Sequence, residues 1–193
     1  MKKLFLLIAA ACASLTAAAD EGMWLLPYLQ KMNIKEMKAR GCKLSAEEIY
    51  SVNKSSLKDA IVIFGGGCTG EIVSPDGLLF TNHHCGYGSI QSLSSVEHDY
   101  LKNGFWAMSR AQELPNEKLN VKFLVRMEEV TDRIAAGETA AQIVEKAKAE
   151  GTGYKASVEQ MYYGNQQFLF VYEQFDDCLL YTSPSPRDTE RSR

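Results

Sequence analysis

Residues 65–87 read GGGCTGEIVSPDGLLFTNHHCGY, and this stretch decides how the chain folds. Two strand-like runs, 69–73 and 78–82, lie on either side of a Ser-Pro-Asp-Gly sequence at 74–77. Proline presets its own backbone dihedral and glycine accepts a positive φ, so this sequence favours a tight turn. The stretch therefore predicts a β-hairpin.

The cysteines bracket this hairpin. Cys68 and Cys85 are 17 positions apart, a spacing that suits a disulfide contributing roughly 3 kcal/mol in the loop-entropy model. Cys12 and Cys178 lie in end segments that we set aside below. Cys42 is then the odd thiol, which we expect to stay unpaired or to meet a partner outside this chain.

The first residues have the pattern of an export signal. Two lysines precede an apolar run over residues 4–11, and small residues follow up to Ala19. This predicts a signal peptide over residues 1–19 and an exported protein, periplasmic or extracellular. The alternative is a lipoprotein signal that uses Cys12. The apolar run is shorter than the roughly 20 residues of a transmembrane helix, so no membrane span is expected.

The last residues differ abruptly from the rest. Residues 178–193 read CLLYTSPSPRDTERSR, which resembles the translation of a sequencing adapter, and we expect a non-native tail there. The alternative is a disordered tail rich in Ser, Pro and Arg. Under either interpretation these residues are left out of the predicted fold.

The charge argues against a nucleic-acid partner. The formal net charge is −3; without the two lysines of the signal and the single net positive charge of the tail it becomes −6 for residues 20–177. A chain this acidic offers no basic surface for nucleic acid. The 158 remaining residues suit one domain.

Patterning elsewhere predicts a mainly β chain with helical insertions. A helical lead-in covers 23–40, and a capping box at Ser45 opens a short helix. Further helices are expected at 139–150 and 157–163, and further strands at 60–64, 119–130 and 168–172.

Two adjacent histidines are the candidate catalytic residues. A serine nucleophile needs an imidazole to remove its proton, and a histidine pKa of about 6.5 suits that task. His83 and His84 are expected at a strand end, where successive side chains point to opposite faces, so only one can face a cleft. The non-catalytic alternatives are a hydrogen-bonded histidine pair and a zinc site of His83, His84, Cys85 and His98. No paired-ligand spacing supports zinc, so neither a metal nor another cofactor is expected.

The stretch at 65–88 resembles the bacterial S46 family of dipeptidyl-peptidases, the dipeptidyl-peptidase 7 and 11 group. The resemblance runs from about residue 22 to 177 and includes 103–106 and 124–126. It implies that His84, which directly precedes Cys85, is the general base, and that a disulfide between Cys85 and Cys68 braces it. His83 is the second candidate, or a residue that packs or hydrogen-bonds behind the site.

The family resemblance also sets the expected fold and activity. It implies that residues 20–177 form part of a first chymotrypsin-like β-barrel and the start of a helical insertion, truncated before the second barrel. The parent protein would be an exported serine exopeptidase that releases dipeptides from the free N-terminus of peptides, as a possible homodimer.

Parts of that machinery are missing from this sequence. The family's Gly-Asp-Phe-Ser-type segment, which carries the catalytic aspartate, and its Gly-Asn-Ser-type segment, which carries the serine, do not occur. We therefore expect this chain alone to be inactive, and no preference for the residue before the cut is assigned. The alternatives are a trypsin-like endopeptidase and a secreted non-catalytic binding or metal module.

Overall fold

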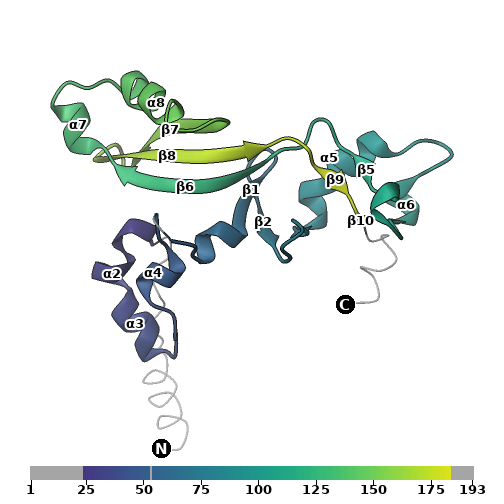
Figure 1. Cartoon of the computed structure of the whole chain (residues 1–193), viewed down its shortest axis with the longest axis horizontal. Coiled ribbons are helices and arrows are strands. Elements are labelled where there is room, and N and C mark those ends of the chain that lie inside the picture. Colours follow the sequence, from purple (N-terminus) through teal and green to yellow (C-terminus); the bar gives the residue numbers. More distant parts are fainter. Residues whose placement is uncertain (1–23, 53, 184–193) are drawn as a thin grey trace, which may run out of the picture. The chain divides into compact units, whose positions relative to one another are not determined.

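The computed structural model describes residues 24–52 and 54–183, in two compact units divided after Cys42 (Figure 1). The predicted signal peptide and residues 184–193 lie outside the described residues. The smaller unit is helical, as the apolar spacing predicted. Its elements are a 3₁₀ turn η1 (Leu26–Tyr28) and two short helices, α2 (Leu29–Met32) and α3 (Ile34–Ala39).

The larger unit is built on a six-stranded sheet, which confirms the prediction of a mainly β chain with helices. All neighbouring strands are antiparallel, in the order β3-β2-β1-β6-β8-β7. Strands β3 and β7 are the two edges. The members are β1 (Ile61–Phe64), β2 (Cys68–Ile72), β3 (Leu79–Phe80), β6 (Val121–Glu129), β7 (Tyr154–Met161) and β8 (Gln166–Phe175).

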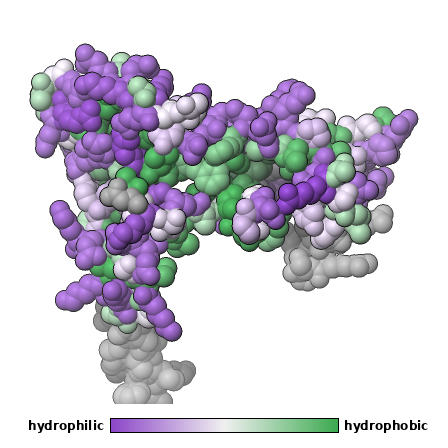
Figure 2. All heavy atoms as spheres, in the orientation of Figure 1, coloured by the Kyte–Doolittle hydropathy of each residue, from purple (hydrophilic) through white to green (hydrophobic). Residues whose placement is uncertain are grey.

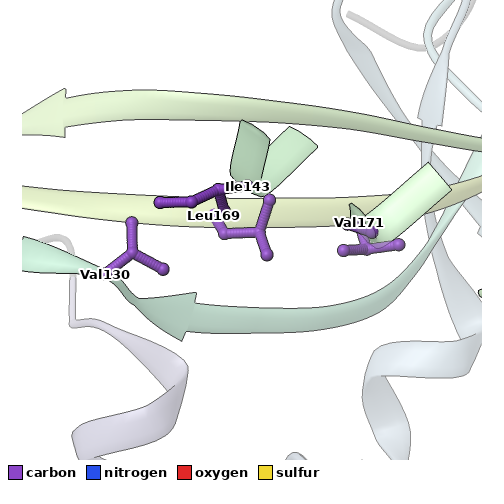
Figure 3. Packing of buried hydrophobic residues seen from close by; sticks show 5 residues of the cluster. Val130, Ile143, Leu169 and Val171 are labelled. Atoms are coloured by element: carbon purple, nitrogen blue, oxygen red, sulfur yellow. The ribbon is translucent and has the colours of Figure 1, made fainter. Parts of the chain in front are cut away.

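The best-buried core lies where a helix covers the long strands. Helix α8 (Ala140–Lys148) begins with a capping box in which the Thr139 hydroxyl accepts a hydrogen bond from the backbone N–H of Gln142. It packs Ile143 against Leu169 and Val171 of β8, all at most 1 % exposed (Figure 3). Val130 and Ala147 complete this cluster, which we call the α8 core.

The helix predicted at 157–163 is wrong: these residues belong to β7 and its turn. Tyr154, Ala156 and Val158 pack on the α8 core, a period of two that is typical of a strand. Apolar residues at that spacing were the signal that the helical interpretation overlooked. The turn that joins β7 to β8 places Tyr162 and Tyr163 at positive φ, 52° and 59°.

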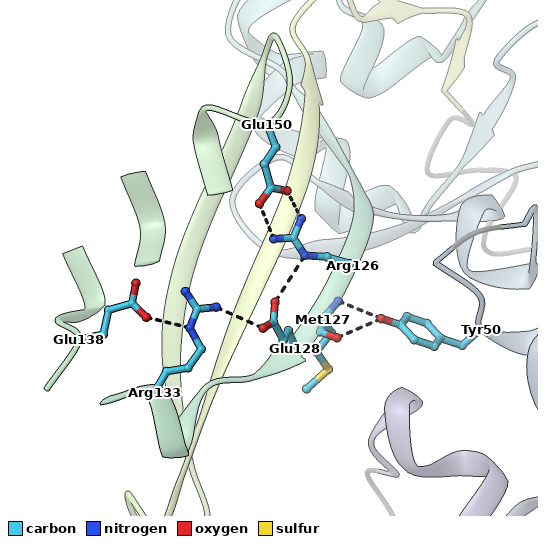
Figure 4. Close-up of polar contacts among 7 residues, drawn as sticks. All are labelled: Tyr50, Arg126, Met127, Glu128, Arg133, Glu138 and Glu150. Atoms are coloured by element: carbon cyan, nitrogen blue, oxygen red, sulfur yellow. Dashed lines mark hydrogen bonds and ion pairs between the residues drawn. The ribbon is translucent and has the colours of Figure 1, made fainter. Parts of the chain in front are cut away.

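Side chains supply hydrogen-bond partners to the backbone of β6 in the part of the strand where β1 no longer pairs with it. Strand β1 pairs with β6 only along 121–123, and a register shift follows at Val125. Directly after the last paired residue, Phe123, the Leu124 carbonyl accepts a hydrogen bond at 3.1 Å from the ammonium of Lys58, whose side chain is 8 % exposed. The Tyr50 hydroxyl accepts from the Met127 N–H at 2.9 Å and donates to its carbonyl at 3.2 Å (Figure 4). Such bonds replace a missing strand partner.

A network of ion pairs connects β6 to the segment 131–150, which contains α7 and α8 (Figure 4). Arg126 of β6 binds Glu150 through both guanidinium NH₂ groups, one at 2.9 Å, and this hydrogen bonding raises the pKa of Arg126. Arg133 of α7 (Thr131–Ala135) binds Glu138 at 2.8 Å and Glu128 at 3.2 Å. The bidentate pair of Arg126 with Glu150 fixes the relative orientation of the two side chains, in addition to pairing their charges.

The remaining elements are short. Residues 179–183, within the predicted foreign tail, form two of them, and that tail was left out of the predicted fold; their origin stays a prediction. Strand β9 pairs with β5 and β10 pairs with β4. The bounds are α4 (Ala46–Ile49), η2 (Leu57–Ala60), α5 (His83–Leu93), α6 (Tyr100–Asn103), β4 (Phe105–Trp106), η3 (Arg110–Gln112), β5 (Leu114–Pro115), β9 (Leu179–Leu180) and β10 (Thr182–Ser183).

Candidate active site

Two hairpins bring the candidate residues together. Strand β1 turns into β2 through glycines, and Gly65 and Gly67 adopt positive φ values of 56° and 138° that other residues rarely accept. The Gly67 N–H donates to the Phe64 carbonyl at 3.3 Å, and Phe64 pairs directly with Cys68. This tight connection places Cys68 at the start of β2.

The second hairpin forms at the predicted turn. The Leu78 N–H donates to the Ser74 hydroxyl at 3.0 Å, and the Val73 N–H donates to the Leu78 carbonyl at 2.8 Å. The following residues stay close to β2, because the Thr81 hydroxyl donates to the Thr69 carbonyl at 2.7 Å. The chain therefore returns toward Cys68 just before the histidines.

The histidines open a helix rather than end a strand, which corrects the prediction. Strand β3 stops at Phe80, and α5 begins at His83 with Asn82 as its N-cap. Asn82 is a residue type favoured at that position, so it was the signal available in the sequence. Neighbouring side chains on a helix diverge by about 100° rather than point to opposite faces.

A disulfide joins Cys68 to Cys85, as the spacing and the family resemblance predicted. Their Cα atoms are 6.0 Å apart. Both half-buried cysteines pack against a second core cluster formed by Val62, Phe64 and Val121, which we call the β1 core. The bond ties the first turn of α5 to the start of β2, one residue away from His84.

His84 and His83 differ in exposure. The His84 side chain is exposed, and its Nε2 lies 3.4 Å from the Cys85 sulfur. The His83 side chain is half-buried and its ring meets the Tyr87 ring edge-on, with centroids 6.1 Å apart at 89°. His83 Nδ1 is buried, and it has no hydrogen-bond partner among the residues described. Tyr87 was not among the predicted site residues, although its four-residue spacing from His83 is a helix contact.

The arrangement does not fit the zinc site weighed above. Cys68, His84 and Cys85 bring ligand-type atoms within 4.8 Å of one another, and His83 and His98 are not in that group. Zinc binds cysteine as a thiolate. Here the two sulfurs are bonded to each other, so this cluster does not offer the thiolate ligands of a zinc site.

A hollow of about 510 Å³ lies elsewhere on the sheet, between η2 and the strands β6 and β8. Lys58, Asp59, Phe123 and Glu173 are among the residues that line it, and none of the histidine-site residues does. In the part of the chain that the structure covers, no helix has both the length and the apolar character needed to cross a bilayer.

Most of the chain, including the segment that carries the histidines, matches one known family. The family described as Peptidase S46 matches residues 19–187, most of the chain. The chain belongs to this peptidase family. The match includes both hairpins and the whole of α5.

Relatives with two names resemble the S46 chain to similar degrees. Dipeptidyl-peptidase 7 of Capnocytophaga gingivalis is 46 % identical over 180 residues, which cover 86 % of this chain and 25 % of that protein. The Asp/Glu-specific dipeptidyl-peptidase of Flavobacterium psychrophilum is 47 % identical over 183 residues, 88 % of this chain and 26 % of that protein. The chain thus spans about a quarter of the length of these relatives.

A solved structure shares the fold of the S46 chain. The crystal structure of Porphyromonas endodontalis DPP11 in complex with the dipeptide Arg-Asp matches with a TM-score of 0.79 and 38 % identity. The match covers 86 % of this chain and 27 % of that chain. The fold described above is therefore similar to part of the larger DPP11 chain.

Proposed function

We propose that this chain is part of an exported serine peptidase that releases dipeptides from the free N-terminus of peptides, with His84 as its general base. The observation that carries the proposal is the exposed His84 imidazole, whose Nε2 lies 3.4 Å from the sulfur of Cys85, the residue that the disulfide ties to β2. S46 membership and relatives named dipeptidyl-peptidases support the reaction class.

The proposed chemistry is acyl transfer. His84 takes the proton from a serine hydroxyl as that oxygen attacks the carbonyl of the second residue of the substrate. The protonated imidazole then gives the proton to the leaving amine, and water hydrolyses the acyl-enzyme with the same base. The serine and its orienting aspartate would come from the part of the protein beyond this chain.

The proposal includes the wider architecture. Residues 20–177 would form a portion of the first chymotrypsin-like barrel together with the start of a helical insertion, and the complete protein would act as a homodimer after removal of residues 1–19. Relatives named for two specificities match at nearly equal identity. The proposed activity therefore carries no assigned preference for the residue before the cut.

The test uses the complete open reading frame recovered from the source DNA. We expect the full-length protein to release dipeptides from peptides with a free amine, and His84→Ala to lower kcat by roughly 10⁴-fold or more. Cleavage of N-acetylated peptides would favour the trypsin-like endopeptidase instead. Residues 20–193 alone should show no hydrolysis; turnover by that piece, or a fully active His84→Ala protein, would contradict the proposal.

A further inference from the structure

Helix α5 exposes one continuous stripe that begins at the proposed base. Its exposed residues are spaced three and four positions apart; they are His84, Tyr87, Gly88, Gln91 and Ser92. Residues at these spacings lie one above the other on the same face of a helix. The turn that follows His84 on this face therefore consists of Tyr87 and Gly88.

The glycine in this turn is not required by the chain itself. A glycine inside a helix costs about 1 kcal/mol relative to alanine. Gly88 does not have a positive φ, so its backbone conformation suits other residues as well. A Cβ added there would meet no atom within 4 Å among the described residues, so packing does not require glycine either. The missing side chain leaves an open space one turn after His84.

Tyr87 stands beside this open space. Its side chain is exposed, and its ring meets the half-buried His83 ring edge-on, with centroids 6.1 Å apart. That contact limits the directions open to the tyrosine ring. An aromatic wall next to a residue without a side chain forms a place where a peptide backbone can come close to the helix and its side chain can meet a ring.

The proposed chemistry determines which part of a substrate comes to this turn. A general base of acyl transfer returns its proton to the leaving amine. The nitrogen of the residue after the cut must therefore come within hydrogen-bond reach of the His84 imidazole. The surface next to His84 on α5 is then within reach of the rest of that residue.

We propose that Tyr87 and Gly88 bind the first residue of the leaving peptide: its backbone passes over Gly88, and its side chain contacts the Tyr87 ring. This inference rests on the proposed function of His84. A tyrosine ring packs well against apolar and aromatic side chains. Peptides with such a residue directly after the cut are therefore the favoured substrates.

The experiment uses the full-length protein and two substrates. One is a tetrapeptide that the wild type cleaves into two dipeptides, with phenylalanine as its third residue. The other is the methyl ester of the same first dipeptide, which has no residue after the cut. Gly88→Leu fills the open space, and Tyr87→Ala removes the ring. We expect each to lower kcat/KM for the tetrapeptide about 10- to 100-fold and to leave kcat/KM for the ester within about threefold of wild type.

The matched control is Gly86→Ala on the same helix. Gly86 lies two residues after His84, about 200° around the helix axis. A Cβ there would lie 3.7 Å from Cδ1 of Ile90, an ordinary contact. Gly86→Ala and Gly88→Leu both raise helix propensity. Gly86→Ala should keep wild-type kcat/KM for both substrates, so a loss confined to Gly88→Leu does not come from a change in helix stability.

The outcomes separate this inference from the proposed function. Unchanged kinetics in both variants, or an equal loss for the tetrapeptide and the ester, would overturn the binding of the leaving residue by Tyr87 and Gly88. A fall in the thermal stability of Gly88→Leu would also overturn it, because another segment of the parent protein would then cover the stripe. His84→Ala is measured alongside: an active His84→Ala protein removes the proposed function itself, whereas an inactive one with unaffected Tyr87 and Gly88 variants removes only this inference.

Discussion

Glu138 is the carboxylate through which the two helices after β6 are connected. It accepts a hydrogen bond from Arg133 of α7 at 2.8 Å (Figure 4). It accepts another from Lys146 of α8 at 2.6 Å, and its side chain is only 21 % exposed. These bonds, first the one from Arg133, lower the pKa of Glu138 from 4.5 to about 2. The ionised form is therefore the one that the fold favours.

This shift makes the stability of the region depend on pH. A carboxylate whose pKa is lowered in the folded state stabilises that state above its unfolded pKa, and the contribution is lost as the pH falls through the folded value. We expect Glu138→Gln to increase amide exchange of α7 and α8 at pH 6. The difference from wild type should shrink between about pH 4.5 and about pH 2.

Hydrogen exchange followed by mass spectrometry, with both proteins compared at each pH, gives the measurement. The control is Glu145→Gln, because Glu145 is 73 % exposed and pairs only with its helical neighbour Lys148 in the interactions described. If the difference in amide exchange between wild type and Glu138→Gln stays constant down to pH 2, the contacts with Arg133 and Lys146 do not keep Glu138 ionised.

At the scale of elements, helix α8 is anchored by Ile143, the larger of its two buried side chains. Ile143 is 1 % exposed and packs on β8 through Leu169 and Val171 (Figure 3). Replacing a buried isoleucine by alanine removes apolar contacts and leaves a cavity, at a cost of about 2–5 kcal/mol. We therefore expect Ile143→Ala to abolish the protection of the α8 amides from hydrogen exchange. Glu145→Ala, on the exposed side of α8, should leave the free energy of opening of this helix within about 0.5 kcal/mol of wild type. Equal protection in the two variants would refute the assignment of Ile143 as the anchor.

The elements that the sequence predicted correctly are those with local signals. The turn before Leu78 and the capping box at Ser45 each need only neighbouring residues, and both occur in the structure. Helix α5 has no such signal beyond Asn82, because Gly86 and Gly88 lower its helix propensity. Contacts distant in sequence hold it: the disulfide to β2 fixes its first turn.

The candidate site was predictable to the same extent. The adjacent histidines and the cysteine pair in the sequence predicted that Cys68 and Cys85 meet beside His84. The buried state of His83 Nδ1 and its contact with Tyr87 depend on the direction of α5. Because that direction is set by the fold around the helix, a strand-end interpretation could not reveal it.

At the scale of the larger unit, the two cores are unequal. The five α8-core residues are at most 1 % exposed, whereas the three β1-core residues are 3–8 % exposed. On the other face of the same strands, away from the β1 core, Ile61 and Phe80 are 40 % and 55 % exposed, and both pair with Glu71 of β2. Figure 2 shows apolar side chains gathered on the visible surface in the region of β1 and β2. Exposed apolar surface of this kind is typical of a face that another part of a protein covers.

This inequality predicts where the chain by itself is ordered. The β6–β8 ladder joins eight residue pairs and the β2–β3 ladder joins two. We expect residues 20–193 to show slow amide exchange in β6, β7, β8 and α8, and fast exchange in β1 to β3 and α5, since protection follows burial and hydrogen bonding. In the full-length protein the β1 to β3 amides should become protected as well, because further strands of the proposed barrel would cover their apolar side chains. Fast exchange of these strands in both proteins would mean that the rest of the parent protein does not pack on the hairpins that carry His84.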